Sequence, residues 1–258
     1  SDGFLDALVG SDDGGPRRLW MNDGTGHFTL SGQVAGFGYT QAIALGHLDG
    51  GAPGNRLDAF IVNGGGPVNH AEVWLHDSSI PALVDSGQSL GWRYGHAVAL
   101  GDLDGDGDLD AFVGNRGGNQ AWINDGFGFY TASGQSLGDD YSYGVALADV
   151  DGDGDLDAYV ANERSAPDRL YLNNGAGQFS DSGLLLGMND SRAVGFADLN
   201  GDGYPDAFVA HKGANWVWFW SPAWGGLVDS GQRLGAWDSR AIALGDLDGD
   251  GDLDAFVG

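Results

Sequence analysis

Short stretches of alternating apolar and polar residues recur along the chain, and acidic loops interrupt them. Residues 143–148 alternate up to such a loop, and the alternation resumes in 156–161 after it. A period of two predicts half-buried β-strands. Two further strands are expected at 169–173 and 178–183, joined by Asn174-Gly175, a pair that tolerates the positive φ of a tight hairpin turn. The pattern therefore predicts units of four short antiparallel strands, which we call the first to fourth strands of a unit.

The four-strand unit repeats with a period near fifty residues. One Asp closes the acidic loop of each copy, and these closing residues are Asp6, Asp58, Asp110, Asp157, Asp206 and Asp254. Four-stranded units at this period are typical of the blades of a β-propeller, whereas a calcium-binding β-roll repeats about every nine residues. We therefore expect residues 1–258 to form a single all-β domain, a β-propeller of four-stranded antiparallel blades with about five repeats.

The strand count leaves ring closure open. Three strands precede the second repeat, four full sets follow, and two strands end the chain, which makes about 21 strands, or five blades plus one strand. The chain is then either a closed five-bladed ring with a spare strand or part of a larger six- to seven-bladed ring. The second alternative is favoured because both ends cut through a repeat.

Composition adds a strong negative charge and removes several kinds of site. The formal net charge is −26, and all but two of the 37 acidic residues are Asp. Short carboxylates gathered in loops favour ligation of a hard cation, and the charge opposes nucleic acid binding, which needs Lys and Arg. The chain has no cysteine, which excludes disulfides, thiolate zinc sites and cysteine nucleophiles. No run of 18 apolar residues occurs, so we expect no membrane insertion.

The acidic loops have the spacing of a calcium site. Asp102, Asp104 and Asp106 alternate, so their side chains can converge, while Gly107 permits a sharp turn and Asp110 closes the loop. The seventh position is expected to contribute its backbone carbonyl. The predicted ligands in the four intact loops are Asp102, Asp104, Asp106, Asp108 and Asp110; Asp149, Asp151, Asp153, Asp155 and Asp157; Asp198, Asn200, Asp202, Tyr204 and Asp206; and Asp246, Asp248, Asp250, Asp252 and Asp254.

These loops predict about four structural calcium ions. Four or five carboxylates in one turn repel one another strongly without a cation, which disfavours a merely solvated acidic turn. Magnesium is disfavoured because it prefers few protein ligands and strict octahedral geometry. The loop from His47 to Asp58 has three extra residues and only two acids, and Arg56 stands in it. Whether that loop binds metal is left open.

The loop Asp-x-Asp-Gly-Asp-Gly-x-x-Asp, followed by an apolar strand, resembles the FG-GAP/VCBS repeat, with Asn200 in place of one Asp in the third intact copy. That family forms propellers such as the integrin α-subunit head and those of some lectins and adhesins. The resemblance covers essentially the whole chain. It implies calcium in the loops and extracellular recognition, and it specifies no ligand.

Strand order predicts a second face that is distinct from the metal loops. Loops after the first and third strands of a blade share one face, and the remaining loops share the other. Nine of the eleven basic residues are expected opposite the metal loops: Arg17, Arg18, Arg93, Arg116, Arg164, Arg169, Arg192, Lys212 and Arg240. Aromatic residues join them there. The candidate ligand-binding residues are Trp92, Arg93, Tyr94, Arg116, Tyr141, Arg164, Arg192, Trp237 and Arg240.

Alternative roles exist for these features. The aromatic residues of this face could pack between blades, and its arginines could offset nearby acids. Trp20, Trp74, Trp122 and Trp218, with Tyr171, hold equivalent third-strand positions and are expected in the core between blades. The recurring Ser-Gly-Gln segments, as at 86–88 and 133–135, indicate a turn or a sheet edge.

The predicted function is a secreted or cell-surface module for recognition or adhesion, which binds carbohydrate or protein through the face opposite the calcium loops, alone or within a larger chain or assembly. The six histidines show no metal-ligand spacing or triad pattern, so no catalytic residue is expected. The alternatives are a polysaccharide-active enzyme domain and a purely structural repeat of a large adhesin or filament.

Overall fold

The computed structural model describes residues 4–50, 56–66, 69–77, 79, 82–91 and 93–258. Within these ranges the chain forms 21 β-strands and no helix. All strand pairs are antiparallel, and the strands of each sheet follow one another in chain order. The all-β prediction and the strand count are therefore confirmed for the described part of the chain.

Four sheets have four strands each. Their strands are β4 (Thr40–Gly46), β5 (Asp58–Asn63), β6 (Ala71–Asp77) and β7 (Ala82–Asp85); β8 (Gly95–Gly101), β9 (Asp110–Asn115), β10 (Gln120–Asn124) and β11 (Tyr130–Ala132); β12 (Ser142–Ala148), β13 (Asp157–Asn162), β14 (Arg169–Asn173) and β15 (Phe179–Asp181); and β16 (Ser191–Ala197), β17 (Asp206–His211), β18 (Asn215–Ser221) and β19 (Gly226–Leu234). Two partial sheets flank them, formed by β1 (Ala7–Val9), β2 (Pro16–Asn22) and β3 (Phe28–Phe37) and by β20 (Ile242–Gly245) and β21 (Asp254–Val257).

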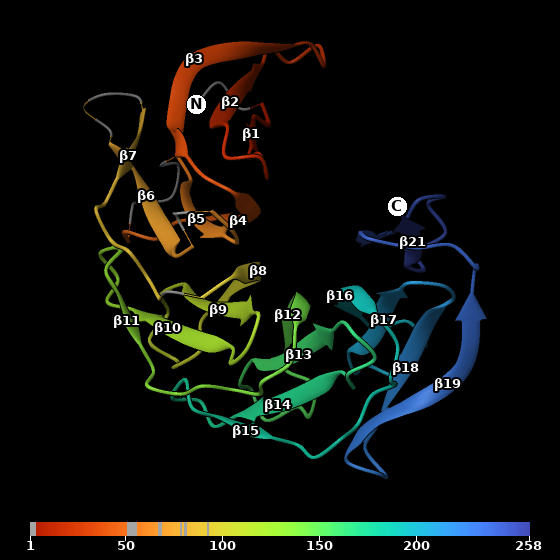
Figure 1. Ribbon diagram of the computed structural model, residues 1–258. Helices are drawn as coiled ribbons and strands as arrows, with labels where there is room; N and C mark the ends of the chain where they lie inside the picture. The colour runs from red at the N-terminus through yellow and green to blue at the C-terminus, as the bar shows by residue number, and fades with distance from the viewer. Residues whose placement is uncertain (1–3, 51–55, 67–68, 78, 80–81, 92) are drawn as a thin grey trace.

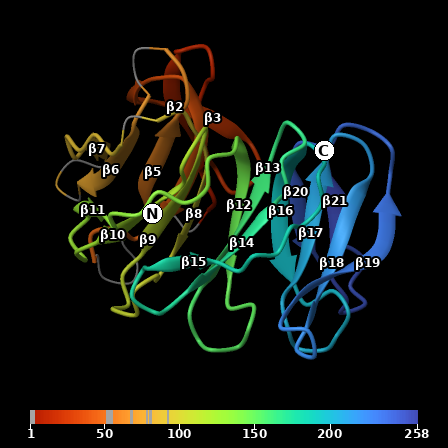
Figure 2. The same cartoon turned by 60° about the horizontal axis from the view of Figure 1, so that its bottom comes forward.

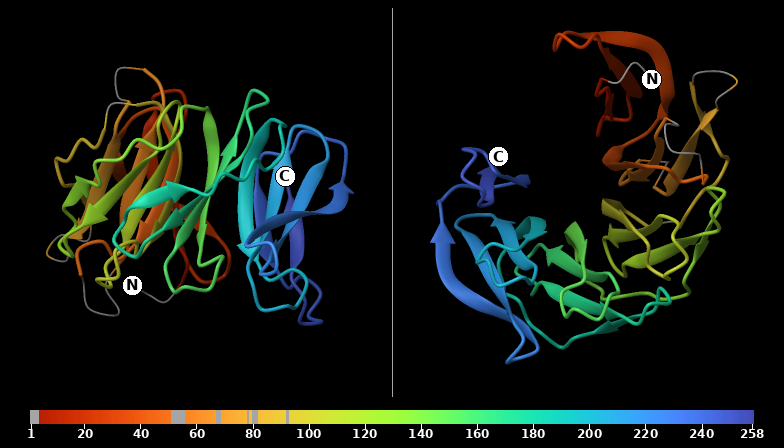
Figure 3. Two further views of the ribbon diagram at one scale, coloured as in Figure 1. Left: turned by 90° about the horizontal axis from the view of Figure 1, so that it is seen from below. Right: turned by 180° about the vertical axis from the view of Figure 1, so that it is seen from behind.

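The sheets stand side by side like blades along an open arc (Figure 1). Strands β4, β8, β12 and β16 line the inside of the arc, and β7, β11, β15 and β19 lie outside, as the view from behind also shows (Figure 3). The two partial sheets lie apart at the ends of the arc, and no described strand of one pairs with a strand of the other. The described sheets do not close a ring.

The core lies between neighbouring sheets and depends on the second strand of each. Every residue of β5, β9, β13 and β17 is buried. Phe60 of β5 meets Tyr130 of the next sheet edge to face, with ring centroids 5.1 Å apart, and Phe112 of β9 meets Phe179 of the sheet after it in the same way. The equivalent Phe256 in β21 is 67% exposed. Full burial at this position therefore requires a following sheet.

The third-strand aromatic residues are in the core, as predicted. Trp74, Trp122, Trp218 and Tyr171 are buried, and Trp122 packs with side chains of the preceding sheet. Trp20 is only half-buried. It belongs to the first partial sheet, which has no described sheet before it.

Glutamine side chains hold neighbouring sheets together at their outer edges. Gln88 donates to the carbonyl of Gly128 (2.7 Å) and accepts from the amide of Tyr130 (2.8 Å). Gln135 makes both bonds to the single residue Phe179, each 2.8 Å long. These residues end the Ser-Gly-Gln segments. The predicted role at a sheet edge is confirmed, and the edge in question is that of the next blade.

Arg17, which the sequence placed among the basic residues opposite the metal loops, is buried between the first two sheets. Its guanidinium contacts Glu72 (2.7 Å), the Asn63 side-chain oxygen (2.7 Å) and the Thr40 hydroxyl (2.8 Å). Burial of an arginine is tolerated because each side of the guanidinium meets an acceptor, one of them ionised. Sequence position alone did not show this, since Arg17 and the exposed Arg18 are neighbours in β2.

The glutamine contacts make a first testable prediction. Gln135→Ala leaves the amide and carbonyl of Phe179 without their partner, so we expect a loss of about 1–3 kcal/mol in the free energy of unfolding. The matched control is Gln232→Ala, because Gln232 holds the equivalent place but its exposed side chain bonds to no described residue. The control is expected to change stability by less than about 0.5 kcal/mol. Urea denaturation of both variants measures the change in stability. Equal losses would contradict a stabilising role for the Gln135 contacts with the next sheet.

Candidate metal loops and the opposite face

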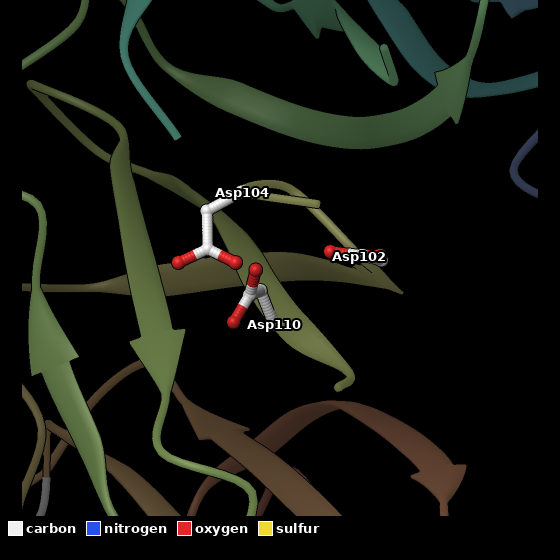
Figure 4. A group of neighbouring side chains, drawn as sticks. All are labelled: Asp102, Asp104 and Asp110. Carbon is white, nitrogen blue, oxygen red and sulfur yellow. The ribbon is translucent and has the colours of Figure 1, made fainter. Parts of the chain in front are cut away.

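The loop between β8 and β9 folds its acids around a common centre. Gly105 and Gly107 have φ of 80° and 94°, a conformation that L side chains rarely adopt. Their amides donate to the two carboxylate oxygens of Asp102, at 2.7 and 3.0 Å. One oxygen from each of Asp102, Asp104 and Asp110 lies within 4.8 Å of the others, and Figure 4 shows these three carboxylates. The two glycines are therefore needed for the turn that gathers the acids.

The other three loops differ in how many acids they gather. The loop before β13 brings together Asp149, Asp151 and Asp157, the same three positions. The loop before β21 brings together its first three acids instead, all of them exposed, and leaves Asp254 outside the group. Within the described residues, the loop before β17 forms no such three-acid group. Asn200 stands there at the third position, and its side-chain oxygen accepts the amide of Asp202 (2.8 Å).

The remaining predicted ligands lie around these groups. Asp106 and Asp153 accept backbone amides two residues further on, at 3.0 and 2.9 Å. Asp108 and Asp155 at the seventh position place their carboxylates against Gly126 and Gly175, in the turn after the third strand of their own sheets. That the seventh position, including Tyr204 and Asp252, ligates through its carbonyl stays a prediction.

The closing Asp has a structural role that the sequence did not reveal. Asp110 is fully buried and accepts the amide of Leu103 in its loop (2.8 Å) and that of Asn124 in β10 (2.7 Å). The same pair of bonds recurs at Asp58, Asp157 and Asp206. This pair of hydrogen bonds is therefore present even in the loop after β4, which has few acids. Residues 51–55 of that loop lie outside the described part of the chain. Each carboxylate oxygen keeps a further lone pair, so metal ligation remains compatible.

Burial sets the protonation of the loop acids when no cation is bound. It raises the pKa of Asp110 to about 6 and that of Asp157 to about 7, while the backbone amides lower it and neighbouring acids raise it again. The pKa values of Asp104 and Asp151 are also raised, first by burial and then by the charge of the next acid. Without a cation, the fold therefore favours the protonated form of these carboxyl groups over the charged form.

The donor set fits a hard divalent cation. All side-chain ligands are carboxylate or amide oxygens, which suit calcium or magnesium and not soft metals. In three of the four intact loops three acids already converge, and the turn is fixed by glycines and backbone amides. The acidic clusters could therefore hold a metal ion with little rearrangement.

The opposite face carries the other set of loops, as strand order predicted. The amide of Arg116, just after β9, donates to the carbonyl of Tyr94 before β8 (2.7 Å). The amide of Glu163 donates in the same way to Tyr141 before β12 (2.9 Å). Loops after the second and fourth strands thus lie together, away from the metal loops.

The candidate ligand residues on this face have different surroundings. Arg192 is half-buried, pairs with Glu163 (2.5 Å) and lies over the ring of Tyr143. Arg116 and Arg164 lie over the ring of Tyr141, at 4.4 and 3.7 Å from its centroid. Arg93, Tyr94, Trp237 and Arg240 are exposed. Trp92 lies outside the described residues.

A β-bulge marks the start of each complete inner strand, and sequence reasoning missed it. The register shifts at Gln41, His96, Tyr143 and Arg192, which hold equivalent positions. The ring of His96 stacks on that of Tyr143, with centroids 4.2 Å apart. Bulges of this kind re-aim side chains. The sequence signal for the bulge was a large residue at the second position of each inner strand, next to small residues.

A second buried polar group was also missed. Asp168 accepts the hydroxyls of Tyr159 (2.9 Å) and Ser191 (2.8 Å) and the amide of Asn162 (2.7 Å). Burial raises its pKa to about 7. Ser191 also lies 2.9 Å from Nδ1 of His211, whose pKa burial lowers to about 4. Because Ser191 is fully buried and stands between the acid and the histidine, this group links two sheets and has no exposed nucleophile.

Comparison with known proteins agrees with the repeat. A family model described as FG-GAP-like repeat matches residues 102–160, 149–209 and 198–257. A lectin of Agrocybe aegerita, described as specifically recognising non-reducing terminal N-acetylglucosamine, is similar in structure, with 17% identity, a TM-score of 0.53, and coverage of 90% of this chain and 66% of the lectin. The V. cholerae biofilm matrix protein Bap1 is similar, with 17% identity, a TM-score of 0.52, and coverage of 93% and 40%. No curated protein matches in sequence.

At this identity the likeness shows a shared β-propeller-like fold alone. The chain spans less than two thirds of the length of either solved relative. In the described part of the chain, no helix is long and apolar enough to cross a membrane.

The raised pKa values predict an unusual dependence on pH. A carboxyl whose pKa is higher in the folded than in the unfolded state binds more protons when folded, so its contribution to stability is lost as pH rises. With a chelator present, we expect the free energy of unfolding to fall between about pH 4 and 7, by up to about 1.4 kcal/mol per pH unit for each such group. Urea denaturation across this range measures the slope.

Two variants separate the effect of the raised pKa values on this pH dependence from that of general charge repulsion. Asp110→Asn is expected to lower stability but to flatten the slope, because it removes one titrating group. Asp139→Asn, an exposed acid on the opposite face, should leave the slope nearly unchanged. A rise of stability with pH in the chelated wild type would contradict the assignment.

Proposed function

This chain belongs to the FG-GAP-like repeat family, and we propose that it is a calcium-stabilised recognition module, which binds carbohydrate or protein through the face opposite its metal loops. The observation that carries the proposal is the contrast between the two faces. One presents converging acids in repeated loops, and the other presents exposed aromatic and arginine side chains.

Calcium is the proposed cation of the four intact loops. It accepts six to eight oxygen ligands in flexible geometry, which suits loops that supply carboxylates, an amide oxygen and backbone carbonyls. Its proposed role is structural, because each loop joins the first two strands of a blade and has little apolar content. Millimolar calcium outside cells would fill even weak sites, so we propose a secreted or cell-surface location.

The recognition face is supported by differences among the repeats. The metal loops of four repeats are nearly identical in sequence, whereas the equivalent segments 92–94, 139–141, 188–190 and 236–238 differ at their first two positions and have Tyr or Asp at the third. Metal ligation and sheet packing constrain the first set equally in every blade. The second set is released from that constraint, as expected where each blade contributes a different contact to a ligand.

The ring is proposed to have more than five blades, with the whole chain as one propeller domain. This is supported by the two partial sheets, which lie apart at the ends of the arc (Figure 1). A structural repeat of a larger adhesin is the second candidate function, supported by the structural similarity to the biofilm matrix protein Bap1.

Calcium binding predicts a crossover in stability. A site filled at a hundred times its dissociation constant adds about 2.7 kcal/mol to the free energy of unfolding, so chelation should lower the melting temperature. Asp104→Asn should be less stable than wild type in calcium, because a ligand is weakened. In a chelator it should be more stable, because one of several repelling acids is removed. Thermal melts in both conditions measure this.

Asp139→Asn is the control for calcium, since it changes charge alone and should show no crossover. Melting temperatures of the wild type that do not respond to chelation would contradict structural calcium.

Ligand recognition predicts that the two faces respond differently to loss of a tryptophan. Trp237 is 85% exposed on the opposite face and Trp224 is 82% exposed on the metal-loop face, so neither is expected to support folding. Trp237→Ala should weaken binding to the best ligand of a glycan array by at least tenfold, because an exposed ring that stacks on a sugar is lost. Trp224→Ala should leave it unchanged. Equal effects would contradict the choice of face.

A further inference from the structure

Two arginines on the opposite face are held in place without an acidic partner. The guanidinium groups of Arg116 and Arg164 lie 4.4 and 3.7 Å from the centroid of the Tyr141 ring, and Arg116 also lies 5.8 Å from that of Tyr94. Both arginines are exposed. Among the described residues, neither takes part in an ion pair, whereas Arg17, Arg169, Arg192 and Arg233 each pair with a carboxylate.

Two acids near Arg164 make other contacts. Glu163, next to Arg164 in sequence, pairs with Arg192 (2.5 Å). Asp190 uses a carboxylate oxygen to accept the amide of Ser165 (2.9 Å). Two guanidinium groups that form no ion pair with a described residue are therefore presented together on a chain whose net charge is −26.

The backbone is strained at this point. Arg164 and Ser165 have φ of 62° and 58°, and they are the non-glycine residues in the left-handed region within the described part of the chain. Such a conformation costs free energy and persists where the surrounding structure enforces it, often at ligand sites. Here the strained turn carries the Arg164 side chain across to the tyrosine that Arg116 also contacts.

We propose that Arg116 and Arg164, held on the ring of Tyr141, form a clamp for the carboxylate of an acidic glycan. A planar guanidinium offers two parallel donors that match a carboxylate, and both guanidinium groups lie within 4.4 Å of the centroid of one ring. This rests on the proposed function and names its ligand class.

A sugar acid fits this clamp better than a neutral sugar. The ring of Tyr141 already carries two guanidinium groups, so it serves as their platform and is not free to stack on a sugar. Tyr94, beside Arg116, is 42% exposed and remains open for that contact. Arg93 lies against Gly117 and Gly118, and it adds a third positive charge at the same place. A chain that contains both uronic acids and uncharged sugars would meet both the charge and the open ring.

The test uses the calcium-loaded protein and a hyaluronan oligosaccharide, with its carboxyl-reduced counterpart as the neutral probe. Isothermal titration should show that the acid form binds at least tenfold more tightly than the reduced form, and that its affinity falls with added salt. Arg116→Ala with Arg164→Ala should remove this preference. Arg164→Lys, which keeps the charge but not the fork, should lose part of it.

Arg56→Ala is the matched control, because Arg56 is an exposed arginine in a metal-face loop, and it should bind like the wild type. Circular dichroism and melting temperature confirm that the variants fold. Equal binding of the acid and reduced forms overturns the clamp, and so does tighter binding of a poly-aspartate peptide than of the glycan. If Trp237→Ala still abolishes glycan binding in that case, the proposed function stands without the clamp.

Discussion

Carboxylates crowded into short loops place the strongest constraint on this molecule. Each complete sheet needs its buried closing Asp, because that side chain accepts amides from both the loop and the third strand. The bonds favour an ionised acceptor, while burial and the neighbouring acids oppose ionisation. A divalent cation bound in these loops would resolve this conflict, since it would stabilise the charged form of the same acids. The same carboxylates thus determine both the hydrogen bonding of the sheets and the charge of the loops.

This constraint separates the two faces. Residues on the loop side are restricted by turn geometry, by charge and by the amides they must satisfy. On the other side the backbone is held by amide bonds between neighbouring segments, such as that from Arg116 to Tyr94, and the side chains are left to vary. A repeated scaffold can therefore present a non-repeated surface, because scaffold and surface use different residues of each repeat.

Much of the fold followed from the sequence because its signals are local and repeated. Alternation, Asn-Gly turns and the Asp spacing identified the strands, their order and the loops that gather acids. The contacts between sheets were less accessible. The burial of Arg17, the clamp by Gln135 and the bulge at Tyr143 depend on which side chain of another repeat lies opposite, and strand patterns carry no such information. The candidate metal loops were predictable as a set, but the distinct grouping in the loop before β21, which leaves Asp254 outside the group, was not.

The glutamine contacts between neighbouring sheets influence how the protein unfolds. Each glutamine contact, like each edge-to-face pair of aromatic rings, joins one sheet to the next. Stability is then a chain of nearest-neighbour couplings, as in other repeat architectures. The opening of one sheet then breaks its contacts with the sheets on either side, so the protection of its amides from exchange depends on both of those interfaces. Cooperativity in this protein is therefore a property of the interfaces between sheets and not of any sheet alone.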